Sequence, residues 1–222
     1  MARMLVIAPH PDDEVLGVGG TILKHLADGH EVHVLICTRG EASRFGKDQV
    51  ERVSAEAKRV HAFLGISGSH FLELPAARLD TVPGTDINAA LADVMTRVAP
   101  DVVYAPHPGD VHRDHQLVFQ AVMVCARPVG SCYPRCIYTY ETVSETDWYA
   151  PPATPAFLPN VFIDISGFID GKLKACAMYE SQIRPSPDQR STEAIKALAV
   201  TRGHAMGMHH AEAFTLVREI VP

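Results

Sequence analysis

Two short polar clusters hold most of the residues in this chain that can do chemistry. The first is Pro9-His10-Pro11-Asp12-Asp13-Glu14, which follows an apolar run at residues 4–8 and joins one imidazole to three carboxylates. The second spans residues 107–115, follows the apolar run 101–105, and contains three histidines and two aspartates. Charges this close together are costly to remove from water unless they are paired or bind a metal. The two clusters therefore predict a functional site.

The types and spacing of these residues favour a metal centre. If residue 113 opens a helix, His112 and His115 lie three residues apart and can face the same side, where His10 and one aspartate of the first cluster can join them. Imidazole nitrogen and carboxylate oxygen suit zinc or a similar divalent ion, and three protein ligands leave a position open for water. Whichever of Asp12 and Asp13 does not bind the metal is then available as a general base. This pattern predicts hydrolysis.

The elements that must position both clusters follow from the apolar pattern. We expect strands at 4–8, 33–37, 70–74, 101–105, 135–140 and 161–165. We expect helices at 14–27, 47–64, 87–98, 115–126 and 167–180, with Gly65 ending the second and Ser166 capping the last. This alternation predicts a Rossmann-like α/β fold: a mostly parallel sheet flanked by helices. Both clusters would then lie at the carboxyl edge of the strands, where such folds bind ligands.

The glycines of Gly17-Val18-Gly19-Gly20 fall inside the first expected helix, where they permit close packing. A dinucleotide-binding fingerprint is a poor interpretation of them. Pyrophosphate needs a helix N-terminus with free N–H groups, and the carboxylates of residues 12–14 would repel it there.

Length and composition narrow the class of protein. We expect one domain over residues 1–222, and the net charge of −6 argues against nucleic acid or an anionic membrane as the main partner. No run resembles a secretory signal or a transmembrane segment, so a soluble, cytoplasmic protein is expected. The five cysteines include no CxxC pair and predict reduced thiols; Cys132 and Cys136 alone make a weak half-site for a metal.

With the residues 15–21 that follow the first cluster, the two clusters resemble the PIG-L, or LmbE-like, zinc-dependent N-deacetylases, which act on N-acetylglucosamine conjugates. The resemblance covers most of the chain, because Thr38-Arg39-Gly40-Glu41, Arg78-Leu79-Asp80-Thr81 and Ala211-Glu212-Ala213-Phe214 also look like family segments. It implies a Zn²⁺ or other divalent cofactor. It also implies that the protein removes acetate from an N-acetylated sugar or glycoconjugate, and it leaves homo-oligomerisation open.

The resemblance also implies a role for individual residues. His10, Asp13 and His115 would bind the metal, and Asp12 would be the general base. His112 would stabilise the oxyanion or protonate the leaving amine, with Asp114 orienting or charging its imidazole. Arg113 departs from the family, since many members have proline there. Candidate substrate contacts are Arg52, Asp110 and Glu14, of which Glu14 is more a supporting residue than a catalyst.

Several features stay open at this level. His107 and Asp110 either line the pocket or brace its turn. Segment 181–191 and the later Arg202, His204, His209 and His210 could recognise a phosphate or sugar, but a solvated surface is favoured. Trp148 and Tyr149 could form an aromatic platform, although ordinary packing is favoured. Two other functions also remain: a non-catalytic metal- or sugar-binding module, and a metal-independent glycosidase with a carboxylate pair.

Overall fold

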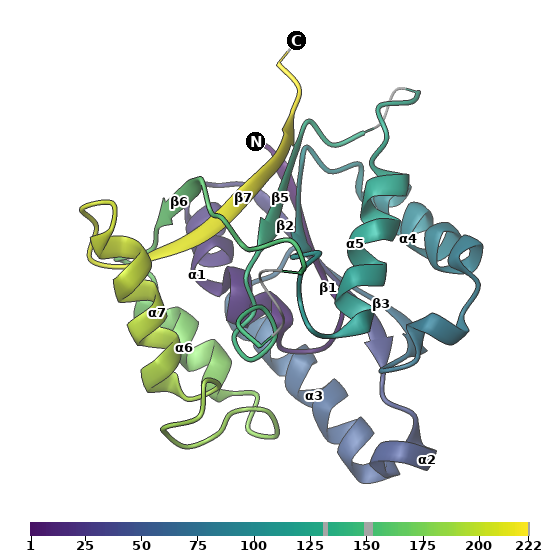
Figure 1. Cartoon of the computed structure of the whole chain (residues 1–222), viewed down its shortest axis with the longest axis horizontal. Helices are drawn as coiled ribbons and strands as arrows, with labels where there is room; N and C mark the ends of the chain where they lie inside the picture. Colours follow the sequence, from purple (N-terminus) through teal and green to yellow (C-terminus); the bar gives the residue numbers. More distant parts are fainter. Residues whose placement is uncertain (131–132, 149–152, 222) are drawn as a thin grey trace.

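A twisted seven-stranded sheet forms the centre of the molecule, with strand order β3-β2-β1-β4-β5-β7-β6 (Figure 1). The computed structural model describes residues 1–130, 133–148 and 153–221. The sheet is parallel from β3 to β5, and β7 pairs antiparallel with both β5 and β6. The strands are β1 Arg3–Ala8, β2 Glu31–Arg39, β3 Gly68–Pro75, β4 Val102–Pro106, β5 Cys136–Tyr140, β6 Val161–Asp164 and β7 Ala211–Glu219.

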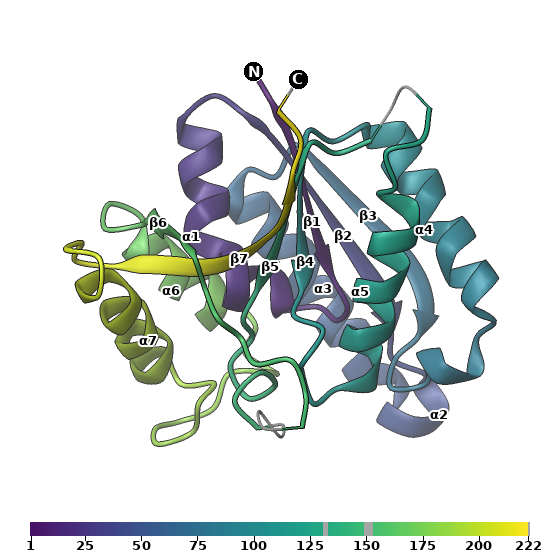
Figure 2. The same ribbon diagram turned by 45° about the horizontal axis from the view of Figure 1, so that its top comes forward.

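Helices cover both faces of this sheet. Alternate side chains of the parallel strands point to opposite faces, and each face buries its own apolar core. One core packs β1 and β2 against α1, α3, α6 and α7, and the other packs the opposite face against α4 and α5 (Figure 2). The helices are α1 Asp13–Ala27, α2 Ala42–Phe45, α3 Lys47–Leu64, α4 Gly84–Val98, α5 Arg113–Cys125, α6 Ile169–Ala177, α7 Thr192–His204 and the short 3-10 helix η1 Leu79–Thr81.

The expected α/β fold is confirmed. The short helices α2 and η1 were not expected, and the larger departures lie in the C-terminal third. Neither α7 nor β7 is predicted from the sequence, and the expected cap on the last predicted helix is wrong. The helix begins at Ile169 after Phe168, while the Ser166 hydroxyl donates to Asp164 at 2.6 Å. Gly65 does end α3, in the left-handed conformation at φ 78°. No helix in the described ranges has the length and apolarity needed to cross a membrane.

The strand order brings the two polar clusters together. From β1 the chain moves outward through β2 to β3 and then returns to β4 on the other side of β1, so the order reverses between β1 and β4. The loops that leave these two adjacent parallel strands diverge there and form a crevice at the carboxyl edge, as doubly wound folds do. The first cluster follows β1 and the second follows β4.

Helix α1, which begins at the first cluster, is held by a buried ion pair. Lys172 Nζ lies 2.5 Å from Glu212 Oε1 and also donates to the carbonyl oxygen of Leu16 at 2.8 Å. Glu212 accepts in turn from the backbone N–H groups of Gly20 and Thr21, at 2.9 and 2.7 Å. The ammonium group of Lys172, from α6, and the carboxylate of Glu212, from β7, thus satisfy backbone groups in the middle of α1. The C-terminal part of the chain fixes α1 in place.

Candidate active site

The turn between β1 and α1 directs adjacent aspartates to different partners. Asp12 has φ 116° and ψ −30°, a left-handed conformation that is strained for a residue with a side chain. Asp13 then opens α1, where a carboxylate is favoured by the positive end of the helix. Asp13 Oδ2 accepts from the backbone N–H of His10 at 2.9 Å, whereas Asp12 Oδ2 accepts from Arg190 at 2.7 Å. The two carboxylates are therefore placed for separate roles.

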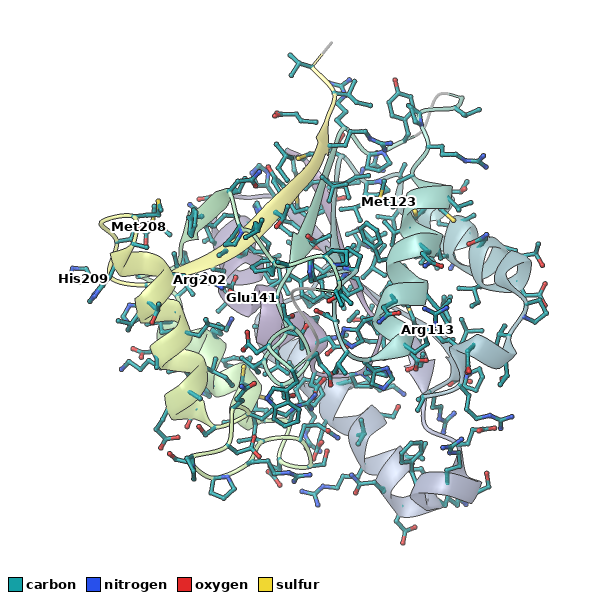
Figure 3. The ribbon with its side chains drawn as sticks, viewed as in Figure 1. Arg113, Met123, Glu141, Arg202, Met208 and His209 are labelled. Atoms are coloured by element: carbon teal, nitrogen blue, oxygen red, sulfur yellow. The ribbon has the colours of Figure 1, made fainter. Side chains whose placement is uncertain are left out.

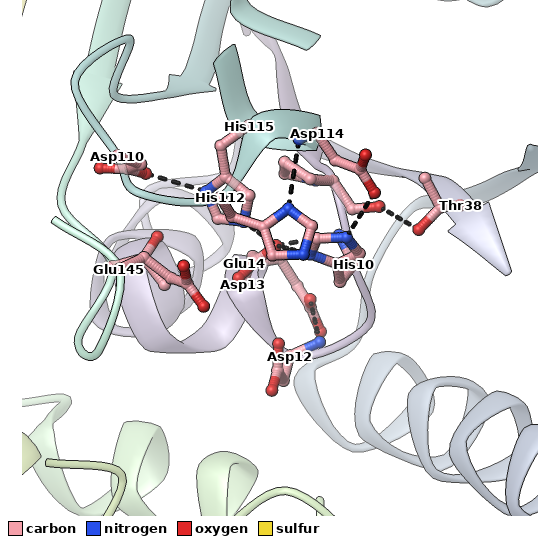
Figure 4. Close-up of polar contacts among 12 residues, drawn as sticks. His10, Asp12, Asp13, Glu14, Thr38, Asp110, His112, Asp114, His115 and Glu145 are labelled. Atoms are coloured by element: carbon pink, nitrogen blue, oxygen red, sulfur yellow. Dashed lines mark hydrogen bonds and ion pairs between the residues drawn. The ribbon is translucent and has the colours of Figure 1, made fainter. Parts of the chain in front are cut away.

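His10, Asp13 and His115 form a compact cluster, with one potential ligand atom of each within 4.8 Å of the others (Figure 4). His115 Nε2 lies 3.2 Å from Asp13 Oδ2. Within the described part of the chain, Asp13 Oδ1 and His115 Nε2 are buried without a hydrogen-bond partner. Buried polar atoms rarely stay unpaired, and a divalent cation would satisfy both. The donor set, two imidazoles and one carboxylate, fits zinc.

Electrostatics around this cluster show strong charge pairing. Burial opposes protonation of His115, but Asp13 and Asp110 outweigh it and raise the pKa of His115 to about 10. Burial likewise opposes protonation of His10, whose contacts with Asp114 and Asp13 raise its pKa to about 9. Although burial works against ionisation of Asp13, His115 and His10 hold its pKa well below the usual value. Without a metal, His10 and His115 thus balance the negative charge of the Asp13 carboxylate.

Asp110 orients His115 from behind. His115 Nδ1 lies 2.8 Å from Asp110 Oδ2, and the Thr146 hydroxyl donates to Asp110 Oδ1 at 2.6 Å. This contact fixes the ring so that Nε2 faces His10 and Asp13, the arrangement that commonly supports metal-bound histidines. Asp110 is fully buried and is absent from the described lining of the cavity. These contacts favour a supporting role for Asp110 over the expected substrate contact.

His112 and Asp114 are placed differently from expectation. The Asp114 carboxylate accepts from the backbone N–H groups of Ala77 and Leu79 and lies 3.0 Å from His10 Nε2, so it does not pair with the His112 imidazole. Instead, the Asp114 backbone N–H donates to His112 Nδ1 at 3.2 Å, which makes His112 the N-cap of α5. His10, His112 and Asp114 form a second possible ligand group, but these contacts already engage Asp114 and His112 Nδ1.

The hydrogen bond from the Asp114 backbone N–H to His112 Nδ1 determines which ring nitrogen of His112 can donate. Burial, together with the charges of His10 and His115, lowers the pKa of His112 to about 4, so its imidazole is neutral near pH 7. Because Nδ1 accepts a backbone N–H, the neutral ring carries its proton on Nε2. His112 lines the cavity, and Nε2 is thus the atom with which it can donate to a bound group.

Asp12 reaches the same cavity from the opposite loop. It is only 3 % exposed, and burial raises the pKa of its carboxyl group to about 8, while Arg190 opposes the rise. A carboxyl group that titrates near neutral pH suits general acid–base work. Glu14 lies beneath it: Oε2 accepts from the Asp12 backbone N–H at 3.0 Å and Oε1 accepts from Tyr179 at 2.5 Å. Glu14 is fully buried, and its contacts favour support of this loop over the expected substrate contact.

A cavity of about 380 Å³ opens beside these residues, a size suited to a small-molecule ligand. His10, Asp12 and His112 are among the residues that line it. Its remaining walls come from the end of β2, from α2 and α3, from β3, and from the segments around residues 145 and 182–190. They include the apolar side chains Phe45, Val50, Val53 and Phe71 and the cations Arg39, Lys58 and Arg190.

Arg52, the other candidate substrate contact, lies elsewhere. It is absent from the described lining of this cavity and pairs with Glu56 at 3.0 Å and Glu180 at 3.3 Å. Arg113, at the exposed start of α5, donates to Gln116 at 2.7 Å.

Most of the remaining candidate residues either contact groups that hold the fold together or lie at the surface. His107 Nε2 lies 2.9 Å from the carbonyl oxygen of Pro155, which favours bracing of the turn. Arg202, on α7, donates two hydrogen bonds to the Glu141 carboxylate (Figure 3). Trp148 is 62 % exposed, whereas Tyr149 and Cys132 lie outside the described residues. His204 and His209 are exposed, as expected for surface histidines.

Sequence reasoning included Arg190 only as part of segment 181–191 and missed its contact with Asp12 in the cavity. The sequence of segment 181–191 predicts a solvated loop, because most of its residues are polar and two are prolines. No local pattern distinguishes Arg190 from Arg184 in the same segment. Only the folded chain does.

A His/Asp cluster fit for a metal, at the crevice of a Rossmann-like sheet and open to a cavity with a carboxylate and an imidazole, defines a candidate metal-dependent enzyme. The PIG-L family model, described as GlcNAc-PI de-N-acetylase, matches residues 5–126, more than half of the chain. The chain belongs to this family.

Similar proteins extend the likeness over nearly the whole chain. A 1D-myo-inositol 2-acetamido-2-deoxy-alpha-D-glucopyranoside deacetylase of Rhodococcus jostii is 28% identical, over 97% of this chain and 91% of the relative. A diacetylchitobiose deacetylase of Thermococcus kodakarensis is 27% identical, over 97% of this chain and 83% of the relative.

Solved structures share the fold. The conserved protein TT1542 of Thermus thermophilus matches with a TM-score of 0.80 and 27% identity, covering 100% of this chain and 97% of that one. The 4-carboxy-2-hydroxymuconate hydratase GalB of Pseudomonas putida matches with a TM-score of 0.75 and 21% identity, covering 100% and 98%. The second likeness concerns the fold alone, so the activity must be argued from the site.

Proposed function

We propose that this protein is a metal-dependent hydrolase that removes the acetyl group from an N-acetylated amino sugar or its conjugate. The observation that carries the proposal is that two buried atoms, Asp13 Oδ1 and His115 Nε2, have no hydrogen bond from the described residues and lie beside a cavity that Asp12 and His112 line. The named deacetylases among its relatives supply the substrate class. Zinc is the proposed metal, with His10, Asp13 and His115 as its ligands.

Each of the other residues has a role that its contacts support. When bound, the metal supplies a Lewis acid for the acetamide carbonyl and makes the attacking water more acidic. Asp12 accepts the proton of that water and later delivers it to the leaving nitrogen. His112 donates from Nε2 to the oxygen on which negative charge develops, a contact typically worth several kcal/mol in such sites. The products are acetate and a free amine.

A direct test measures acetate release by the zinc-loaded protein. The substrate panel contains N-acetylglucosamine, diacetylchitobiose and an N-acetylglucosaminyl inositol. Asp12→Asn should retain metal, because Asp13 and not Asp12 contacts the histidines, but should lower kcat by about 10²- to 10⁴-fold, the usual contribution of a general base. Metal content is measured on the same preparations.

The matched control is Asp93→Asn, because Asp93 lies on the exposed side of α4 and pairs only with Arg97 among the described residues. This control should retain full activity. Undiminished turnover in metal-free protein would refute the mechanism. Metal binding without acetate release from any substrate would instead indicate a binding module, and release of a sugar that resists chelators would indicate a glycosidase.

A further inference from the structure

Arg190, in the segment before α7, lies directly against Asp12. Its Nη1 donates to Asp12 Oδ2 at 2.7 Å, and this is the only hydrogen bond that the Asp12 carboxylate receives from the described residues. Its Nη2 lies 3.5 Å from Glu145 Oε1. The Arg190 side chain is 20% exposed and lines the cavity. Arg190 thus joins the first cluster to the loop after β5.

The guanidinium group is itself fixed by neighbouring contacts. Arg190 Nε donates to the Ser144 hydroxyl at 2.8 Å, and the adjacent Gln189 Oε1 accepts from the Ser144 backbone N–H at 2.7 Å. On the other side, the Ser191 hydroxyl accepts from the backbone N–H of Ala194 and caps α7. The planar, multi-donor guanidinium can hold two groups at a set angle, which a lysine ammonium cannot do. Arg190 is therefore a fixed donor.

Asp12 depends on such a donor for its position. It makes no side-chain cap to α1, and its backbone has the left-handed conformation described above. A general base must lie within hydrogen-bond reach of the proton that it accepts, and a misplacement of about 1 Å can lower the rate about 10²-fold. We propose that Arg190 is a positioning residue that holds the Asp12 carboxylate in its reactive orientation. This inference rests on the proposed function of Asp12.

A different role would leave a different kinetic signature. If Arg190 mainly bound the substrate, its loss would raise KM. If it only stabilised the fold, its loss would lower the unfolding temperature, and an added small molecule would not restore turnover. If it positions Asp12, its loss lowers kcat while KM and metal content stay close to wild type.

The test compares wild type, Arg190→Ala and Arg184→Ala as zinc-loaded proteins on the substrate that the wild type deacetylates best. Arg190→Ala should lower kcat about 10²-fold, change KM less than about threefold and retain metal. Millimolar guanidinium, well below denaturing concentrations, should restore part of kcat. Arg184 is the matched control, since it lies in the same segment, is exposed, and its side chain donates only to the Ser181 carbonyl at 3.4 Å among the described contacts. Its backbone N–H donates to the Arg190 carbonyl at 3.3 Å, a bond that alanine can also make.

Unchanged kcat in Arg190→Ala, or a loss that appears only in KM, would overturn the inference even if wild-type activity confirms the proposed function. Absence of wild-type acetate release would instead refute the proposed function. Should Arg190→Ala fail to fold, Arg190→Gln serves as the second variant. A wild-type kcat in Arg190→Gln with an intact fold would again overturn the inference.

Discussion

At the residue scale, one backbone turn separates the roles of two identical side chains. Asp12 and Asp13 are adjacent, yet Asp13 contacts His10 and His115 while Asp12 faces the cavity and Arg190. The left-handed conformation of Asp12 turns the chain sharply into α1 and so sends the two carboxylates in different directions. The strain at this position coincides with the proposed general base, as strained residues often coincide with functional sites.

A prediction at this scale concerns the support of His115. Asp110→Asn removes the negative charge behind His115 Nδ1 but preserves the size of the side chain. We expect zinc affinity to fall by about 10- to 100-fold, the usual effect of losing such a contact. Competition with a chromophoric chelator measures this affinity. Arg113→Ala, which alters an exposed residue next to the same cluster, should bind zinc like wild type, and equal affinity in Asp110→Asn would show that the contact does not support the metal.

At the element scale, α1 depends on the C-terminal part of the chain. Its glycines allow neighbours to approach: a Cβ on Gly17 would come within 2.3 Å of the Tyr140 ring, and one on Gly20 within 2.7 Å of Ile165. The expected close packing of these glycines is confirmed. Glu212 and Lys172 also form hydrogen bonds with the backbone of α1. The position of the N-terminus of α1, and hence of Asp13, follows from these contacts.

Two glycine substitutions should therefore have opposite effects on stability. Alanine normally favours a helix over glycine, yet Gly20→Ala should lower the free energy of unfolding by about 1–3 kcal/mol, because Ile165 is fully buried and cannot yield without strain. Gly84→Ala, at the open start of α4, meets no atom within 4 Å and should be neutral or stabilising by less than about 1 kcal/mol. Urea unfolding of both variants decides the matter, and equal effects would contradict this account of α1.

At the scale of the whole molecule, the reversal of strand order between β1 and β4 assembles a site from residues more than 100 positions apart. The sheet also joins both ends of the chain, because β7 lies in the same sheet as β1. We propose on this ground that residues 1–222 form one domain. Removal of β7 should then destabilise the entire sheet.

Zinc binding should stabilise the folded protein, and the size of this stabilisation should depend on pH. His10 and His115 have folded pKa values of about 9 and 10, above the unfolded value of about 6.5. Their protonation therefore stabilises the metal-free fold below pH 6.5, and this contribution is lost as the pH rises toward 9–10. Metal binding needs neutral imidazoles, so zinc stabilisation should increase over the same interval.

Thermal unfolding of zinc-loaded and metal-free protein at pH 6.5 and 8.5 measures this coupling. At one free zinc concentration, about 100 times the Kd at pH 8.5, we expect a rise in Tm of about 5–10 °C at pH 8.5 and a smaller rise at pH 6.5, where zinc binds more weakly. His115→Ala is the control and should abolish most of the difference. A rise that is independent of pH would contradict the assignment of these histidines as ligands.

The amino-acid sequence by itself determined the fold class, the six strands 4–8 to 161–165, and the two clusters at their carboxyl edge. These inferences succeed because apolar periodicity is a local property, and because parallel strands must end at one edge. The types and spacing of the donors indicated a metal site built from His10, one of the two adjacent aspartates and the histidines of the second cluster. The family resemblance then singled out His10, Asp13 and His115, which the structure brings together. Their role as ligands stays a proposal.

Only the tertiary structure decided which partner each polar group has. Strand β7 and helix α7 are weak local patterns, and buried Glu212 in β7 is stabilised by Lys172 from α6. The supporting contacts of Asp110 and Glu14, and the placement of Arg190 against Asp12, likewise join segments that the sequence keeps apart. Ion pairs and hydrogen bonds between distant residues leave no periodic pattern, because they form only when the whole chain has folded.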